Sequence, residues 1–145
     1  MSPQHRKLLD ARIAELRSQV GKGGLRECVM RGMLYIGMAR GMVDERSLEA
    51  LRQLRRSDES KRITLAQFKM IVREQFFMLL LEPEASLAAI PKLLPKGEDE
   101  RRAGLAVIRE VVSATGADLS GEIGRRLDRV TQLFGLTAEP HAKAS

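Results

Sequence analysis

The sequence predicts an all-α protein, folded as a single compact bundle of about seven helices. Apolar residues recur at intervals of three and four through most of its 145 residues, which is the period of a helix with one buried side. Aromatic residues make up only 3% and Trp is absent, so aliphatic side chains and methionines must build the core. A chain of this length buries about two-thirds of its unfolded surface, which is enough for one domain.

The first helix is indicated by an apolar stripe that a glycine-rich segment follows. The stripe consists of Leu9, Ile13, Leu16 and Val20. The sequence GKGG at 21–24 ends this helix, because glycine readily adopts the left-handed conformation that follows a helix. Residues 1–24 are therefore expected to form an N-terminal helix and linker, ahead of a helical domain over 25–136.

The second helix is expected from about Leu25 to Ala39 and should be buried, because its apolar residues point in nearly every direction. Gly32 and Gly37 inside it each cost about 1 kcal/mol of helix stability relative to Ala. Both are therefore expected where a neighbouring helix approaches closely. Asp44 then caps a third helix, whose leucines recur at helical spacing as far as Leu54.

The fourth helix opens at Thr64, which forms a capping-box pattern with Gln67, and it runs to Leu81. It is apolar on two sides. One side consists of Leu65, Phe68, Val72, Phe76 and Leu79. The other consists of Met70, Phe77 and Leu81, with Met78 beside them. The first side should face the core of the domain, and the second is covered either by the segment that follows or by a partner.

Proline and glycine separate the remaining helices. Pro83 suits the first turn of a short fifth helix, and Pro91 should divide or kink the segment after it. A sixth helix is expected over 99–115, and a seventh after a cap at Ser120. Residues 137–145 have no apolar pattern and are expected to form a disordered tail.

Positive charge is concentrated in the first part of the chain. Residues 1–62 hold 14 Lys and Arg against 8 Asp and Glu, which accounts for the whole net charge of +6. A basic face of this kind suits an acidic protein partner or an anionic surface. Nucleic acid is disfavoured, because acidic residues interrupt the basic ones at helical spacing and no aromatic side chains are interleaved for base stacking.

The residue types that carry catalysis or bind metals are scarce. The two histidines, His5 and His141, lie near the two ends of the sequence, where neither is expected to be held rigidly as a general base. No zinc or calcium spacing is present. No catalytic residue, cofactor or metal site is therefore predicted, and the chain is expected not to be an enzyme.

The expected location is the cytoplasm. The single Cys28 cannot form an internal disulfide and lies in an apolar stretch, which is typical of a reduced, buried thiol. No signal-peptide pattern is present, and no segment approaches the roughly 18 apolar residues of a membrane-spanning helix.

Two stretches resemble a known helical family. MLYIGMARGMVDERSLEALRQLR (33–55) and VIREVVSATGADLSGEIGRRLDRVTQLFG (107–135) each read as helix, glycine turn and acid-started helix, and this pairing is similar to tellurite-resistance, TerB-like domains. TLAQFKMIVREQFFMLLLEPEASLAAIPKLLP (64–95) and RLDRVTQLFG (126–135) further resemble the C-terminal helical part of bacterial proteins related to polyhydroxyalkanoate synthases. Those proteins carry an α/β-hydrolase region ahead of this part.

The resemblance implies a fold but no metal site and no catalytic activity. TerB-like domains place an acid before the turn glycine, where it contributes to a cation site. Here Arg40 precedes Gly41 and Thr115 precedes Gly116, so no metal site is implied. The hydrolase motif is absent from this sequence, so no synthase or depolymerase activity is implied either.

The sequence therefore favours a non-enzymatic helical interaction module, which binds a protein partner or itself. The partner that the resemblance suggests is a hydrolase or polyester-synthase type of domain. The alternatives are peripheral binding to a polyester granule or anionic membrane through the basic first half, and a TerB-like role in a stress response. The candidate interaction surface consists of Arg52, Arg55, Arg56, Met70, Phe77, Met78 and Leu81.

Overall fold

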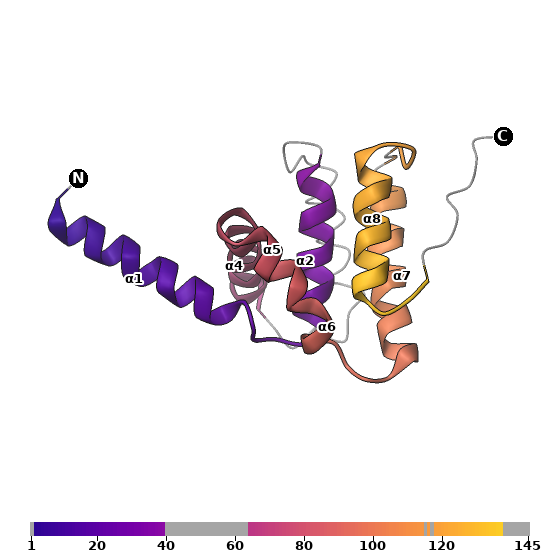
Figure 1. Cartoon of the computed structure of the whole chain (residues 1–145), viewed down its shortest axis with the longest axis horizontal. Coiled ribbons are helices and arrows are strands. Elements are labelled where there is room, and N and C mark those ends of the chain that lie inside the picture. The colour runs from indigo at the N-terminus through magenta and orange to yellow at the C-terminus, as the bar shows by residue number, and fades with distance from the viewer. Residues whose placement is uncertain (1, 40–63, 115, 117, 138–145) are drawn as a thin grey trace.

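The structure, a computed structural model, describes residues 2–39, 64–114, 116 and 118–137, and this part of the chain is helical with no strand. The predicted all-α fold is confirmed. The helices in order are α1 (Pro3–Gln19), α2 (Leu25–Met38), α4 (Leu65–Leu81), α5 (Pro83–Ala88), α6 (Ile90–Leu93), α7 (Glu98–Ala114) and α8 (Glu122–Leu133) (Figure 1). The helix expected after Asp44 and most of the expected tail lie outside the described residues.

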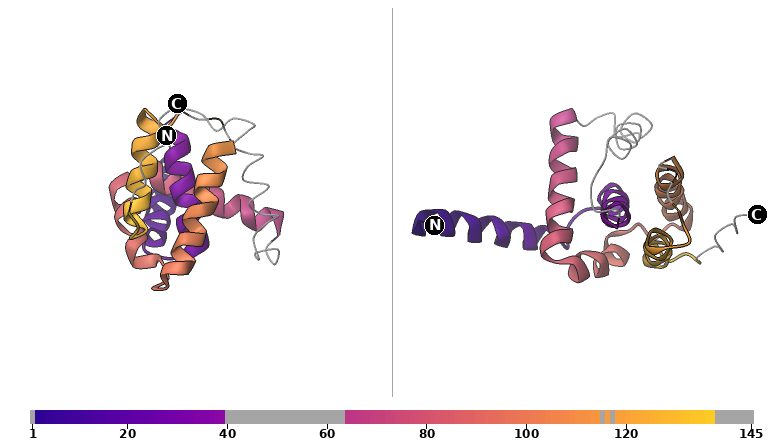
Figure 2. Two further views of the ribbon diagram at one scale, coloured as in Figure 1. Left: turned by 90° about the vertical axis from the view of Figure 1, so that its right-hand side faces the viewer. Right: turned by 90° about the horizontal axis from the view of Figure 1, so that it is seen from above.

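Helix α2 lies at the centre of the bundle. Helices α4 and α5 pack on one side of it, and α7 and α8 on the other (Figures 1 and 2). Most of its residues are buried, as the sequence predicts from its all-round apolar character. The core also takes apolar side chains from α4 to α8, among them Phe68, Leu87, Ile108 and Phe134.

Only one of the two glycines of α2 lies at a close helix contact. A Cβ on Gly32 would come 3.0 Å from Val130 Cγ1 and 3.1 Å from Ile108 Cδ1, both in the packed core. A Cβ on Gly37 would meet nothing within 4 Å. The expectation of close approach is therefore confirmed at Gly32 and wrong at Gly37.

Local sequence signals explain where several helices begin. Thr64 accepts a bond from the Gln67 backbone N–H (3.1 Å), and the Gln67 side chain accepts one from the Thr64 N–H (2.9 Å), which confirms the predicted capping box. Pro91 lies in the first turn of α6 and divides it from α5, also as predicted. The predicted cap at Ser120 is wrong, because its hydroxyl donates to Asp118 (2.7 Å) and Gly121 takes the capping position of α8.

Helix α1 projects away from the bundle, and its contacts with the bundle are made near its C-terminal end (Figure 1). Leu16 is its one buried residue, and Val20 is buried just after it. The predicted stripe of Leu9, Ile13, Leu16 and Val20 is therefore covered over its second half only. No helix in the described part of the chain is long and apolar enough to cross a membrane.

Candidate interaction surface

Helix α4 carries an exposed apolar stripe on the side that faces away from α2. Its buried residues, which include Phe68 and Leu79, face the core. Met70, Phe77 and Leu81 are 54%, 40% and 43% exposed. Their spacing of seven and four residues places them on one side of the helix. These three residues are called the α4 stripe below.

Helix α5 does not cover the α4 stripe. It packs beside the end of α4, where the Ser86 hydroxyl donates to the Met78 backbone carbonyl (3.1 Å). Of the two alternatives for this side of α4, cover by the following segment is therefore wrong for Met70, Phe77 and Leu81. The side remains open to solvent.

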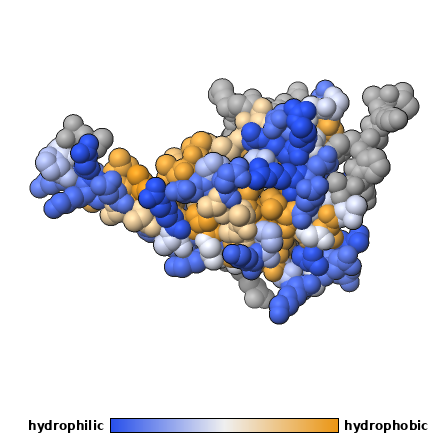
Figure 3. Space-filling model, in the orientation of Figure 1, coloured by the Kyte–Doolittle hydropathy of each residue, from blue (hydrophilic) through white to orange (hydrophobic). Residues whose placement is uncertain are grey.

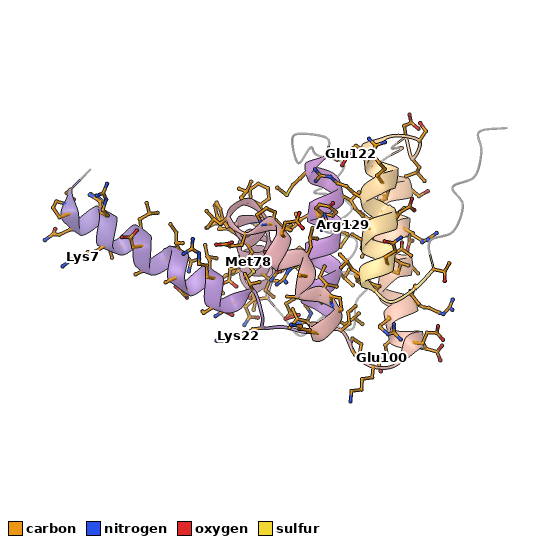
Figure 4. The ribbon with its side chains drawn as sticks, viewed as in Figure 1. Lys7, Lys22, Met78, Glu100, Glu122 and Arg129 are labelled. Atoms are coloured by element: carbon orange, nitrogen blue, oxygen red, sulfur yellow. The ribbon has the colours of Figure 1, made fainter. Side chains whose placement is uncertain are left out.

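Met78 does not belong to the exposed surface, which corrects its inclusion among the candidate interaction residues. It is 1% exposed (labelled in Figure 4). The reason is its place on the helix: it follows the buried Gln75 by three residues, so both point toward α2. Its sulfur lies 3.5 Å from the Arg31 Nη2 atom.

The surroundings of the α4 stripe are mainly basic. Lys69 and Arg73 are exposed beside the stripe. Glu74 is half-buried and lies within the stripe, four residues after Met70 and three before Phe77. The Phe77 ring packs edge-to-face on Phe76, with ring centroids 5.8 Å apart, which restricts its orientation. An apolar surface with a basic border and a fixed aromatic ring is suited to binding.

Helix α1 carries exposed apolar side chains of its own. Leu8 and Leu9 are 70% and 48% exposed. Figure 3 shows apolar surface both on α1 and on the edge of the bundle beside it. Arg17 of α1 pairs with Glu82 at the end of α4, with 2.7 Å between Nε and Oε1. The two helices meet there and diverge, so they form an open corner (Figure 2, right).

A buried arginine connects the helices behind this corner. Arg31 of α2 is fully buried. Its Nε donates to the Gln75 side chain (2.7 Å), and its Nη1 donates to the carbonyls of Val20 (3.1 Å) and Ser86 (2.9 Å). Among the residues that the structure describes, no carboxylate pairs with it. Burial lowers the pKa of Arg31, and the guanidinium joins the end of α1 to α4 and α5.

A second basic cluster lies on α8, and its charges are paired. The guanidinium of Arg126 stacks on the Tyr35 ring, 4.6 Å from the centroid, and donates to the Tyr35 carbonyl (2.6 Å). Arg129, labelled in Figure 4, reaches from α8 to Glu84 (2.7 Å), and this bond lowers the pKa of the Glu84 carboxyl. These contacts hold α8 against α2 and α5, so the cluster serves the fold.

The described residues offer no group of three His, Cys, Asp or Glu side chains that could hold a metal ion. Cys28 is fully buried, with its sulfur 3.8 Å from the Ile90 carbonyl. Burial raises the pKa of the Cys28 thiol to about 11, so the thiol stays protonated at neutral pH. It packs as a small apolar side chain.

The structure brings together part of the predicted surface. Met70, Phe77 and Leu81 form the α4 stripe, Met78 is buried, and Arg52, Arg55 and Arg56 lie outside the described residues. Sequence reasoning missed the exposure of Leu8, Leu9, Leu65 and Leu80. Leu65 was expected on the core-facing side of α4, which is wrong, because it lies in the first turn of the helix and is 45% exposed. The sequence could have placed Leu80 on this surface, because it follows Phe77 by three residues and so lies beside it on the helix.

Comparison with known proteins identifies a similar segment inside a much longer polypeptide. No family model matches the chain, and no solved structure matches it significantly. A Rhizobium meliloti protein, described as an uncharacterized protein in ackA 5'region, is 52% identical over 136 residues. The match takes in 93% of this chain but 18% of the relative, so the chain spans less than a fifth of that protein's length.

Proposed function

We propose that the chain is a non-enzymatic helical module that binds a protein partner through the outward side of α4. The observation that carries the proposal is the α4 stripe, three large apolar side chains that stay at least 40% exposed while the opposite side of the same helix is packed in the core. Large apolar side chains that stay exposed on one side of a helix are a candidate interaction site.

The similar segment in the Rhizobium meliloti protein supports this role. There it makes up 18% of the polypeptide, so it lies beside a large remainder of the same chain. A helical unit in that setting suits docking onto another domain. The resemblance to proteins related to polyhydroxyalkanoate synthases makes a hydrolase-type domain the first partner to test.

The experiment measures association and folding in matched variants. Phe77→Ser and Met70→Ser each remove one side chain of the α4 stripe, and Leu65→Ser makes the same kind of change at an exposed position on another side of α4. Each protein is tested by affinity capture from cell extract with quantitative mass spectrometry and by sedimentation velocity alone. Helical circular dichroism confirms that all variants fold.

The expected result is a protein, or a second copy of the chain, that the unaltered chain and Leu65→Ser both bind. The two stripe variants should lose about 1 kcal/mol or more of binding free energy, because a central apolar contact is removed. Equal association in all four proteins, or none in any of them, would rule out the α4 stripe as a binding surface.

Peripheral binding to an anionic surface is a second candidate, and one observation favours it. Among the described residues, Leu8 is the most exposed large apolar side chain, and it follows Arg6 and Lys7 near the N-terminal end of α1, where Figure 4 labels Lys7. Basic helices with exposed leucines bind anionic lipid. Sedimentation with anionic vesicles at low and high salt tests it, and Leu8→Ser should then weaken binding more than Phe77→Ser.

A further inference from the structure

We infer that α1 is a releasable arm, whose docked end leaves the bundle as one unit while the bundle stays folded. This inference concerns the chain by itself and does not rest on the proposed function. It is carried by three features: the small docked end of α1, the separate capping of α1 and α2, and the glycine-rich linker between these helices.

The docked end of α1 is small. Residues 2–12 are exposed, Leu16 is the one buried residue of the helix, and Val20 is buried just after it. Two polar contacts fasten the same end. One is the ion pair of Arg17 with Glu82, which water screens because the arginine side chain is 64% exposed. The other is the bond from Arg31 Nη1 to the Val20 carbonyl. Few contacts therefore have to break for α1 to leave the bundle.

Helices α1 and α2 are capped separately. At the start of α1, the Ser2 hydroxyl accepts a bond from the His5 backbone N–H (3.2 Å). At the start of α2, the Gly24 backbone N–H donates to the Glu27 carboxylate (3.2 Å). Each helix therefore satisfies part of its N-terminus with its own local groups. Helix α2 keeps its bond when α1 leaves.

The linker of residues 21–24 is suited to act as a hinge. Gly21, Lys22 and Gly23 are exposed. A Cβ on Gly21 or Gly24 would meet nothing within 4 Å, so the surroundings of these two residues are open. Gly23 has a φ of 125°, which residues with a side chain rarely adopt. Because glycine also adopts many other backbone conformations at low cost, rotation within the linker can carry α1 away and leave α2 in place.

Release changes the surface of the bundle. Leu16 and Val20 become exposed, together with the part of α4 that α1 contacts. Arg31 loses the Val20 carbonyl as an acceptor but keeps its bonds to α4 and α5. A helix of 17 residues is marginal in water without packing, so α1 also melts when it is released. The released state is therefore detectable by amide exchange at the C-terminal end of α1.

The test is hydrogen–deuterium exchange of the full chain at several low urea concentrations. Amides of residues 14–19 should exchange at least about tenfold faster than those at the centre of α2. Their exchange should depend little on urea, because release exposes little surface, whereas exchange in α2 should follow global unfolding. The same rate and urea dependence in both segments would overturn the inference, because α1 would then unfold only with the bundle. A lack of any protection over 14–19 would overturn it as well, because α1 would not be docked.

Matched substitutions test whether docking controls this exchange. Leu16→Ala removes a buried side chain and should speed exchange over residues 14–19 about tenfold or more. Leu8→Ala, the same change at an exposed position of α1, should leave it within about twofold. Glu82→Gln removes the ion pair and should speed it about two- to threefold, with exchange in α2 unchanged. If Leu16→Ala has no effect over 14–19, or speeds exchange in α2 equally, the inference is overturned.

Discussion

At the residue scale, the unusual feature of this protein is Arg31, a fully buried cation whose hydrogen-bond acceptors are all uncharged. Two carbonyl oxygens and one side-chain amide accept its three shortest bonds, at 2.7 to 3.1 Å. A buried charge is costly unless such bonds replace its hydration. The acceptors come from α4, α5 and the end of α1, so one side chain fixes how three elements meet.

Removal of the Arg31 guanidinium should therefore destabilise the fold strongly. In Arg31→Met the carbonyls of Val20 and Ser86 and the Gln75 amide stay buried without their donor. The expected loss is about 3 kcal/mol in the free energy of unfolding, measured by urea denaturation. Arg102→Met removes an exposed pair with Glu98 and serves as control, with a loss within about 0.5 kcal/mol. Equal losses in the two variants would contradict the role assigned to Arg31.

Cys28 should make stability fall at high pH. The pKa of the thiol is about 11 in the fold against 9.0 for the ordinary group. Between these values the unfolded chain releases the proton while the folded chain keeps it, so the free energy of unfolding falls as pH rises, by on the order of 2 kcal/mol. Below pH 9 the contribution is constant.

The measurement compares the protein with Cys28→Ala at several pH values between 8 and 11. The alanine variant should be less stable at pH 8, because a buried sulfur is lost, and the difference should shrink or reverse by pH 11. Other groups titrate in both proteins and cancel in the difference. A difference that stays constant over this range would show that the thiolate is tolerated in the folded state.

At the element scale, α2 shows how one helix can carry two glycines for different reasons. Gly32 lies where Val130 and Ile108 approach the backbone, so its missing side chain makes room for α7 and α8. Gly37 has open space around the position of a Cβ and only costs helix stability. Sequence alone treats these two residues alike.

The two glycines therefore provide a matched pair of substitutions in the same helix. Gly37→Ala should raise the free energy of unfolding by up to about 1 kcal/mol, because alanine has the higher helix propensity. Gly32→Ala makes the same gain but forces apart a packed contact, which costs about 1–3 kcal/mol. In thermal denaturation, Gly37→Ala should have a higher melting temperature than Gly32→Ala. The opposite order would mean that α7 and α8 move away from the added methyl group at little cost.

At the scale of the whole molecule, the domain consists of a packed bundle and one helix that leaves it. The bundle is centred on α2, and α1 contributes only Leu16 and Val20 to its buried apolar residues. Most of α1 is solvated, although its apolar stripe continues outward. The first half of α1 therefore adds little to the stability of the fold, and its second half holds the helix to the bundle.

Two truncations test this division of roles. Removal of residues 1–12 should change the free energy of unfolding by less than about 1 kcal/mol, because residues 2–12 are exposed. Removal of residues 1–20 also takes away Leu16, Val20 and an acceptor of Arg31, and it should cost about 3 kcal/mol. A large loss of stability with the shorter truncation would place α1 in the core.

The sequence by itself determined the helical class and most helix boundaries of this protein. The capping box at Thr64 and the division at Pro91 depend on hydrogen bonds and dihedral angles among near neighbours, which a local pattern contains. Helical spacing also placed Met70, Phe77 and Leu81 on one side of the fourth helix. Their exposure needed the structure, because spacing does not say which side is covered.

Only the tertiary structure decided what is buried and what stays open. Arg31 meets its acceptors 11, 44 and 55 positions away in the sequence, so no local pattern could reveal that an arginine would be buried. Met78 was predicted on the outer side and is inside, because it faces the same network. Burial depends on which distant segments meet, and for that physical reason the open corner between α1 and α4 could be found only in the folded chain.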